Sequence, residues 1–180
     1  VGYAFNTFYA VRWAGVNPTN GRPLYLDRDG NTTEDYSVDD RVFTNKSSIP
    51  VYQGGFNTSL SYKGFSLDAN FTFAADVYRD NGTLAVAEDP GLINISNVTS
   101  NLVTAWKQPG DITSIPALNT GSVRLLFTDR YIEDASYLRL KTIALGYSLP
   151  EKMLGNTPLS SIRIYAQAEN LLTWTKWRGF

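Results

Sequence analysis

Strict alternation of apolar and polar side chains is the feature that most narrows the folds open to this chain. Over residues 162–169 every even-numbered position is Ile or Ala, and the odd-numbered positions hold Arg163, Tyr165, Gln167 and Glu169. Such alternation indicates a β-strand with one apolar and one polar face. The sequence therefore predicts a long strand over residues 160–172, with another over 137–149 before it and a compact turn at 150–158 between them. Whether the apolar face meets a protein core or lipid decides what the chain does.

The cleanest hairpin pattern spans residues 51–77. Even-numbered positions from Phe56 to Tyr62 alternate with Asn and Ser, and beyond Lys63 and Gly64 the odd-numbered positions 65–73 are Phe, Leu or Ala. A two-residue Lys-Gly link fits a tight turn between antiparallel strands. Strands of about 10 residues with aromatic ends are typical of transmembrane β-barrels, but a soluble sandwich or barrel alternates in the same way. The hairpin alone leaves both architectures open.

The lengths of the connections favour the membrane architecture. A two-residue link, a long segment over 78–121 without a strand pattern, and a medium turn over 150–158 follow one another. Outer-membrane barrels alternate short turns on one side with long loops on the other, whereas long connections are uncommon in compact domains. Inside the long segment, residues 94–106 are predicted to hold one or two helical turns, with one side formed by Val98, Leu102, Val103 and Trp106.

Other strand signals are weaker. Residues 2–13 and 123–127 are each predicted as a strand, and residues 23–26 as a short extended piece between a turn at 15–21 and a polar loop at 32–48. The run Asp27–Asn31 has the acidic look of a calcium loop but lacks a closing glutamate, so an Asx turn is the preferred interpretation. In the strand at 137–149 the apolar phase shifts after Leu140. A β-bulge near Thr142 explains this shift, and burial of both strand faces is the alternative.

Composition excludes several function classes. Lys and Arg number 16 against 17 Asp and Glu, for a net charge of -1, which argues against a nucleic-acid partner. The absence of Cys and His removes the commonest metal ligands and general base, so no metal, cofactor or catalysis is expected. The carboxylates Asp111, Glu133 and Asp134 could pair as in a glycosidase, but nothing in their spacing singles them out. No apolar run approaches the roughly 18 residues of a transmembrane helix. The chain begins without Met and stops straight after a strand, so we expect it to be a fragment of a longer polypeptide.

Two motifs carry a family resemblance. SYLRLK at residues 136–141 followed by LGY at 145–147, and AENLLT at 168–173, stand in the order typical of one family, and the remaining segments agree over nearly the whole chain. The sequence resembles the C-terminal part of SusC/RagA-type TonB-dependent outer-membrane transporters of Bacteroidetes. In that family the second motif continues into an aromatic residue, a glycine and Asp-Pro-Glu, whereas this chain ends at Gly179 and Phe180.

The resemblance implies an all-β fold in which antiparallel strands form part of a transmembrane barrel of about 22 strands with a plugged lumen and long extracellular loops. Residues 1–180 would supply roughly a third of that barrel, at its C-terminal end, without the plug or the TonB box. It also implies import of oligosaccharides or peptides across the outer membrane, together with a SusD-like surface lipoprotein. Energy would come from TonB, which acts through an N-terminal region outside this sequence.

Candidate site residues follow from the same interpretation. Apolar faces would meet lipid, and polar faces would face the lumen through Asp68, Asn70, Arg163, Gln167 and Glu169. Loop residues Trp106, Tyr78 and Arg79 are candidates for ligand contact, and packing of the long loop is the favoured alternative for Trp106. Trp174 and Trp177 are expected at the membrane interface or in the outer loops rather than in a binding site. The competing function is a soluble β-sandwich that binds carbohydrate, which would fold in water without further strands.

Overall fold

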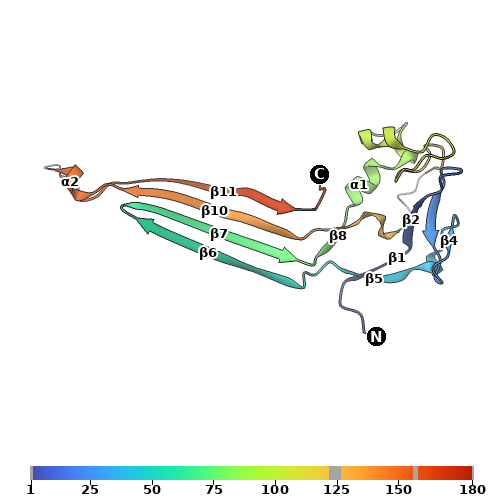
Figure 1. The fold of residues 1–180 in the computed structure, drawn as a ribbon, viewed down its shortest axis with the longest axis horizontal. Helices are drawn as coiled ribbons and strands as arrows, with labels where there is room; N and C mark the ends of the chain where they lie inside the picture. Colours follow the sequence, from blue (N-terminus) through green and yellow to red (C-terminus); the bar gives the residue numbers. More distant parts are fainter. Residues whose placement is uncertain (1, 122–126, 156–157, 180) are drawn as a thin grey trace. The chain divides into compact units, whose positions relative to one another are not determined.

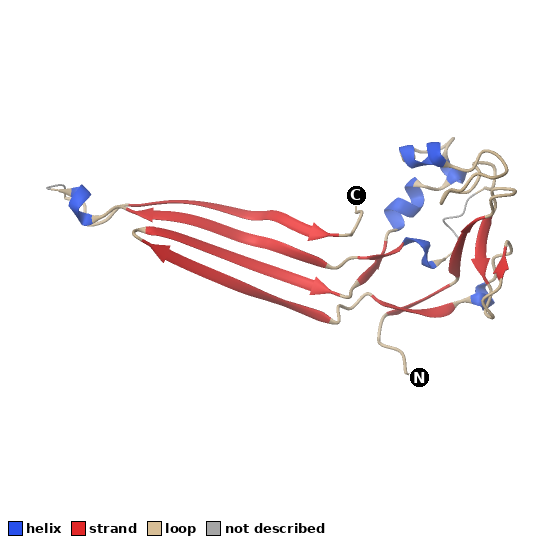
Figure 2. Ribbon diagram, viewed as in Figure 1, coloured by secondary structure: helices blue, strands red, loops and turns tan. Residues whose placement is uncertain are grey.

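A computed structural model describes residues 2–121, 127–155 and 158–179 (Figures 1 and 2). The chain divides into two compact units. Unit 1 comprises Val1–Ile49, Tyr78–Asp134 and Trp177–Phe180, and unit 2 comprises Pro50–Val77 and Ala135–Lys176. Within the described part of the chain, no helix is long and apolar enough to cross a membrane.

Unit 2 is a four-stranded antiparallel sheet in the order β11-β10-β7-β6. Its strands are β6 (Tyr52–Tyr62), β7 (Phe65–Ala75), β10 (Tyr137–Ser148) and β11 (Arg163–Thr175). The hairpin and both strands predicted from alternation are therefore confirmed. The last strand starts and ends about three residues later than predicted, because its pairing with β10 continues to Thr175. In the turn before it, the short helix α2 (Glu151–Leu154) was not predicted.

The predicted tight turn joins β6 to β7. Lys63 and Gly64 have φ of 47° and 88°, the two left-handed residues that a turn matched to the twist of a hairpin needs. A Cβ on Gly64 would lie 2.7 Å from the carbonyl oxygen of Ser148. The Ser148 N–H in turn donates to the carbonyl of Gly64 at 2.8 Å. Glycine is required here by backbone conformation and by the close approach of β10.

A bulge in β10 reconciles its two apolar phases, as predicted. Its pairing with β7 shifts between Leu140 and Thr142, so Lys141 is an extra residue relative to β7. Relative to β10, β11 carries one more residue at the same level, next to Asn170 with a φ of 52°. Side chains on either side of the bulge thus return to the same face, and the alternative of a strand buried on both faces is not needed.

The long insertion of residues 78–134 leaves the sheet between two hydrogen-bonded neighbours, β7 and β10. At its base the Ala135 N–H donates to the Val77 carbonyl at 2.8 Å, and the Asp76 N–H donates to the Ser136 hydroxyl oxygen at 3.0 Å. At the opposite end of the sheet lie the two-residue turn and the segment that joins β10 to β11. A two-residue turn and a medium connection at one end, and the long insertion at the other, match the asymmetry read from the sequence.

Unit 1 is built from short strands and single helical turns. Its sheets are β1 (Thr7–Ala10) with β5 (Val42–Ser47), β2 (Arg12–Val16) with β3 (Pro23–Leu26) and β4 (Thr32–Thr33), and β8 (Tyr78–Asp80) with β9 (Ile132–Asp134). Its helical turns are η1 (Val38–Asp40), α1 (Gly82–Ala87), η2 (Pro90–Leu92), η3 (Ser100–Thr104) and η4 (Asp129–Tyr131).

Several predictions for unit 1 need correction. The polar loop predicted at 32–48 is wrong, since it contains β4, η1 and β5. The strand predicted at 2–13 is two strands, broken at Val11, which is fully buried and bridges Thr128 instead of continuing either sheet. The turn predicted from Gly15 begins later, because β2 runs through Val16. These elements depend on partners far along the chain, which local pattern does not show.

Other local predictions for unit 1 are confirmed. The piece at 23–26 is β3. The turn at residues 27–31 is closed by the Asp27 side chain, with the Asn31 N–H donating to Oδ1 at 2.8 Å and the Asn31 side-chain amide donating to Oδ2 at 3.0 Å, four residues on and not the two of a simple Asx turn. The strand predicted at 123–127 falls, apart from Phe127, outside the described residues.

The predicted helical turn in the long segment is η3. Val98 packs against a small core of Leu102, Ala105 and Ile115, as its predicted side requires. Val103 does not belong to that side, because its side chain is 70% exposed. The sequence predicts no strand over residues 78–121, and this is wrong at the start of the segment, where β8 and then α1 form.

Candidate functional site

The sheet of unit 2 separates an apolar face from a polar one. Cross-strand pairs such as Leu60↔Leu67, Leu67↔Leu145 and Leu145↔Ala166 extend one apolar row across all four strands. Further along the same face Phe56 stacks on Phe71, its cross-strand partner, with ring centroids 4.7 Å apart.

This apolar face is open. Leu60 is 61% exposed, Phe65 63%, Leu145 57% and Ile164 66%. A contiguous exposed surface of this kind is rare on soluble proteins and needs a lipid or protein partner. A soluble sandwich would have packed such a face against a second sheet.

All five residues predicted to face the lumen lie on the opposite, polar face. Asp68 and Gln167 flank Ala144, while Asn70 and Glu169 flank Thr142, so four of them form two cross-strand rows. Each charged side chain among them is bonded to a neutral one. Ser59 donates to Asp68 at 2.6 Å, and Gln167 donates to Glu169 at 3.3 Å.

Arg163 completes the polar face by crossing a strand. Its Nη2 donates to the Ser66 hydroxyl oxygen at 3.1 Å, although β10 lies between β11 and β7. The path is open because Gly146 has no side chain. A Cβ there would lie 3.0 Å from the guanidinium and 2.7 Å from Ser66 Oγ. The glycine of the LGY motif thus allows the Arg163 side chain to link β11 to β7 across β10.

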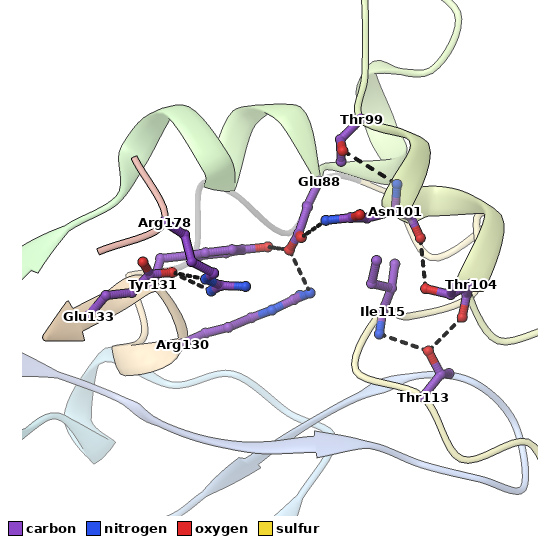
Figure 3. Close-up of polar contacts among 10 residues, drawn as sticks. All are labelled: Glu88, Thr99, Asn101, Thr104, Thr113, Ile115, Arg130, Tyr131, Glu133 and Arg178. Atoms are coloured by element: carbon purple, nitrogen blue, oxygen red, sulfur yellow. Dashed lines mark hydrogen bonds and ion pairs between the residues drawn. The ribbon is translucent and has the colours of Figure 1, made fainter. Parts of the chain in front are cut away.

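Unit 1 contains a buried polar network centred on Glu88 (Figure 3). The carboxylate accepts hydrogen bonds from Asn101 Nδ2 at 2.9 Å and Tyr131 Oη at 3.2 Å, and it pairs with Arg130 Nη2 at 3.5 Å. The side chains of Glu88 and Arg130 are only 7% and 8% exposed. Because Glu88 follows α1 and Asn101 lies in η3, the network ties both helical turns to η4.

Aromatic rings enclose the arginine of this network. The Arg130 guanidinium carbon lies 4.7 Å from the Trp13 ring centroid and 4.8 Å from that of Tyr131. Burial lowers the pKa of Arg130, and the neighbouring Tyr131 and Glu88 oppose that shift. Burial likewise raises the pKa of Tyr131, so its hydroxyl stays a donor to Glu88. Arg130 Nη1 is buried without a hydrogen-bond partner, which makes Glu88 its essential counter-charge.

A second ion pair lies beside the network. Glu133 in β9 pairs with Arg178, whose Nε donates to it at 2.9 Å, and Glu133 Oε2 also accepts from Asn81 at 3.3 Å. Donation of this hydrogen bond to the Glu133 carboxylate raises the pKa of Arg178. Asn81 is buried and caps α1 through the Leu84 N–H at 3.1 Å. Residues after β11 are therefore fixed to the insertion within unit 1.

Threonine hydroxyl groups make hydrogen bonds that fix the backbone of residues 99–115, after α1 and η2. Thr99 caps η3 through the Asn101 N–H at 3.3 Å, and the Thr113 hydroxyl donates to the Thr104 carbonyl at 2.6 Å (Figure 3). The Ile115 N–H donates back to the Thr113 hydroxyl oxygen at 3.2 Å. These bonds hold residues 104–115 as a compact turn over the core that contains Ile115.

The three predicted ligand residues fall in two places. Tyr78 and Arg79 lie in β8, where Lys46 approaches the Tyr78 ring at 5.8 Å. Trp106 lies after η3, where its indole N–H donates to the Pro18 carbonyl at 3.0 Å. Its ring also rests on Gly21, so the packing role considered for Trp106 is present.

Two of the three carboxylates considered for catalysis, Asp111 and Glu133, make structural contacts in the part of the chain that the structure describes. No group of three or more Asp or Glu residues is placed to hold a metal ion there. Asp111 accepts the N–H groups of Lys107 and Gln108 at 3.0 and 3.1 Å, which closes a turn. Glu133 is engaged with Arg178. Sequence reasoning missed Glu88, Arg130 and Tyr131 altogether, and the only local hint was a lone acid next to an apolar helical turn.

Comparison with known proteins gives the family. No family model matches the chain. It is 33% identical over 99% of its length to TonB-dependent receptor P3 of Formosa agariphila, and 30% identical over 99% to the TonB-dependent receptor SusC of Bacteroides thetaiotaomicron. The structure of the RagAB peptide transporter matches 96% of the chain with a TM-score of 0.85 and 33% identity. The RagAB peptide importer in its open-open state matches 99% with a TM-score of 0.87.

The chain spans 18% and 17% of the two sequence relatives and 20% of the matched chain in each structure. The resemblance seen in the SYLRLK, LGY and AENLLT motifs is thus borne out over nearly every residue. It agrees with the open apolar face, the polar face behind it and the long insertion at one end. The sheet of unit 2 is part of an outer-membrane β-barrel wall, and the chain is a segment of a SusC/RagA-type TonB-dependent receptor.

Proposed function

We propose that the complete protein imports oligosaccharides or peptides across the outer membrane by a TonB-dependent mechanism, and that this chain supplies barrel wall and extracellular loop. The observation that carries the proposal is the open apolar face over four strands, joined to a packed insertion at one end of the sheet. Relatives named as TonB-dependent receptors, SusC and a peptide transporter support transport over catalysis. Asp111 and Glu133 are hydrogen-bonded to backbone N–H groups and to Arg178, respectively, which also favours transport over catalysis.

In this proposal residues 1–180 form the C-terminal part of the barrel, and the plug and the TonB-contacting segment belong to other parts of the polypeptide. The polar face, with Asp68, Asn70, Arg163, Gln167 and Glu169, faces the lumen. Hydrogen bonds to neutral neighbours hold these charged side chains against the sheet without neutralising them, so their charge still acts on the lumen. A SusD-like lipoprotein closes over the extracellular side, and Tyr78, Arg79 and Trp106 contact the ligand.

The test is made on the full-length protein. Outer-membrane fractions are separated by electrophoresis with and without boiling, and affinity capture is used to look for a co-purifying lipoprotein. We expect a species much larger than 20.0 kDa that shifts on heating. Cells that lack the gene should also take up either a maltodextrin or a peptide mixture more slowly. A soluble species that shows no heat shift would refute the barrel, and unchanged uptake of both nutrients would refute import.

A further inference from the structure

A groove of about 430 Å³ lies in the insertion beside Trp106. We call it the Trp106 groove. Apart from Trp106 its walls are mainly aliphatic, from Leu102, Val103, Ala105, Ala117 and Leu118. Its volume falls in the range of small-ligand sites. All of these residues belong to unit 1, so the groove is complete within that unit.

The indole that forms one wall is held rigidly. Beyond the hydrogen bond to Pro18, the Trp106 N–H of the backbone donates to Ile115 at 3.0 Å. Gly21, with a φ of 73°, supports the ring from behind, where a Cβ would lie 2.4 Å from Trp106 Cε3. The Ala117 N–H donates to the Gly21 carbonyl at 2.9 Å. A wall fixed in this way loses little conformational entropy when a ligand binds, which favours affinity.

The lining selects among ligand classes. A sugar presents hydroxyl groups on every side, and each one that is buried against aliphatic carbon without a partner is costly. Only Lys107 and Asn119 offer polar side chains here. Val103 and Leu118 are 70% and 43% exposed, so a bound ligand could bury apolar surface on both residues. The groove therefore suits an aliphatic or aromatic side chain.

Charge adds a second requirement. Among the described residues the Lys107 ammonium makes no ion pair. The nearby Asp111 carboxylate is occupied by the backbone N–H groups of its own turn. A cation at the edge of an apolar groove attracts a ligand that combines an apolar side chain with a carboxylate.

We propose that the Trp106 groove binds an apolar side chain of an imported peptide, whose carboxylate pairs with Lys107. This inference rests on the proposed import function and narrows its substrate to peptides at this site. Trp106 thus supports the loop through one ring face and offers its other side to the ligand.

The test uses the full-length transporter, purified in detergent together with any co-purifying lipoprotein. The probes are an elastase digest of casein, which is rich in peptides with apolar termini, and a maltodextrin mixture. Bound peptides are identified and counted by mass spectrometry. We expect the bound peptides to be enriched in apolar residues. Val103→Asp should reduce the amount of these apolar peptides bound about ten- to a hundredfold. Lys107→Gln should reduce it less, about fivefold at most, with an effect that weakens in high salt.

Ile112→Asp is the matched control. Ile112 is also β-branched and 98% exposed, but it does not line the groove. Equal effects of Val103→Asp and Ile112→Asp, or binding of maltodextrin alone, would overturn the inference and leave import intact. Loss of the lipoprotein from the Val103→Asp complex, with peptide binding unchanged, would assign the groove to that partner instead. Failure of both probes to bind wild type would also overturn the inference, and failure of import would be judged separately from the uptake assay.

Discussion

Replacing Glu88 by Gln should loosen α1 and η3 from η4 within the insertion without unfolding the sheet of unit 2. The substitution keeps the shape of the side chain but removes the charge that balances Arg130. Both side chains are more than nine-tenths buried, and Arg130 Nη1 already lacks a partner. Breaking a buried pair in this way costs about 3–5 kcal/mol, because one charge is left uncompensated. The two rings around Arg130 return part of that cost, which places the expected loss near the lower end, about 3 kcal/mol.

Amide hydrogen exchange in the full-length receptor measures this loss. In α1 the Ala85 N–H donates to Asn81 at 3.0 Å and the Glu88 N–H donates to Leu84 at 2.8 Å, so both amides report opening of the segment. A loss of about 3 kcal/mol corresponds to exchange roughly a hundredfold faster, up to the limit set by the wild-type opening free energy. Strands β7 and β10 should exchange as in wild type.

Two variants make the interpretation specific. Glu34→Gln makes the same chemical change in an ion pair whose partner Arg22 is 65% exposed, and α1 should not respond to it. Glu88→Gln combined with Arg130→Met removes both charges and should restore much of the protection. Unchanged exchange of the α1 amides in Glu88→Gln, or no recovery in the double variant, would refute the view that the charge pair holds α1 to η4.

Three further predictions follow from other parts of the molecule. Leu145→Arg places a charge on the apolar face and should destabilise the folded barrel in the membrane by about 2–4 kcal/mol, seen as a weaker heat-shifted band. The control Ala144→Arg places the same charge on the polar face and should assemble normally. Gly21→Ala should displace the Trp106 indole, since the added carbon has no room, and tryptophan fluorescence should shift to the red; an unchanged spectrum would contradict the described packing. Burial raises the pKa of Tyr25 to about 12, so its folded state retains the phenol proton longer than the unfolded state. The stability that Tyr25 contributes should be complete below about pH 10 and lost as pH rises towards 12, seen as a phenolate absorbance step that disappears in Tyr25→Phe.

Prediction from sequence succeeded where alternation is long and local. β6 and β7 are joined by two residues, so their pattern and their pairing are both visible in one short window. The bulge in β10 was also visible, since the phase change after Leu140 has few physical explanations. The polar-face positions of Asp68 and Gln167 follow directly from the same alternation.

The insertion could not be predicted in this way. β5 pairs with β1, and β8 pairs with β9 across more than fifty intervening residues, so neither has a local partner to reveal it. The network around Glu88 joins four residues from three separate helical turns, and each of them alone looks like an ordinary polar loop residue. Its existence depends on burial, which composition does not show for single charged side chains.

The hydrogen bonds at the base of the insertion have a consequence for how such receptors diversify. Because Val77 and Ala135 are bonded to each other and the strands before and after them are paired neighbours, the wall is closed beneath the insertion whatever the insertion contains. Lengthening a loop whose ends are already held together costs only about 0.6 kcal/mol for each doubling. The insertion can therefore be exchanged for one of different length and sequence while the register of the wall stays the same. If the insertion contacts the ligand as proposed, replacing it would change ligand preference without altering the strand pairing of the wall.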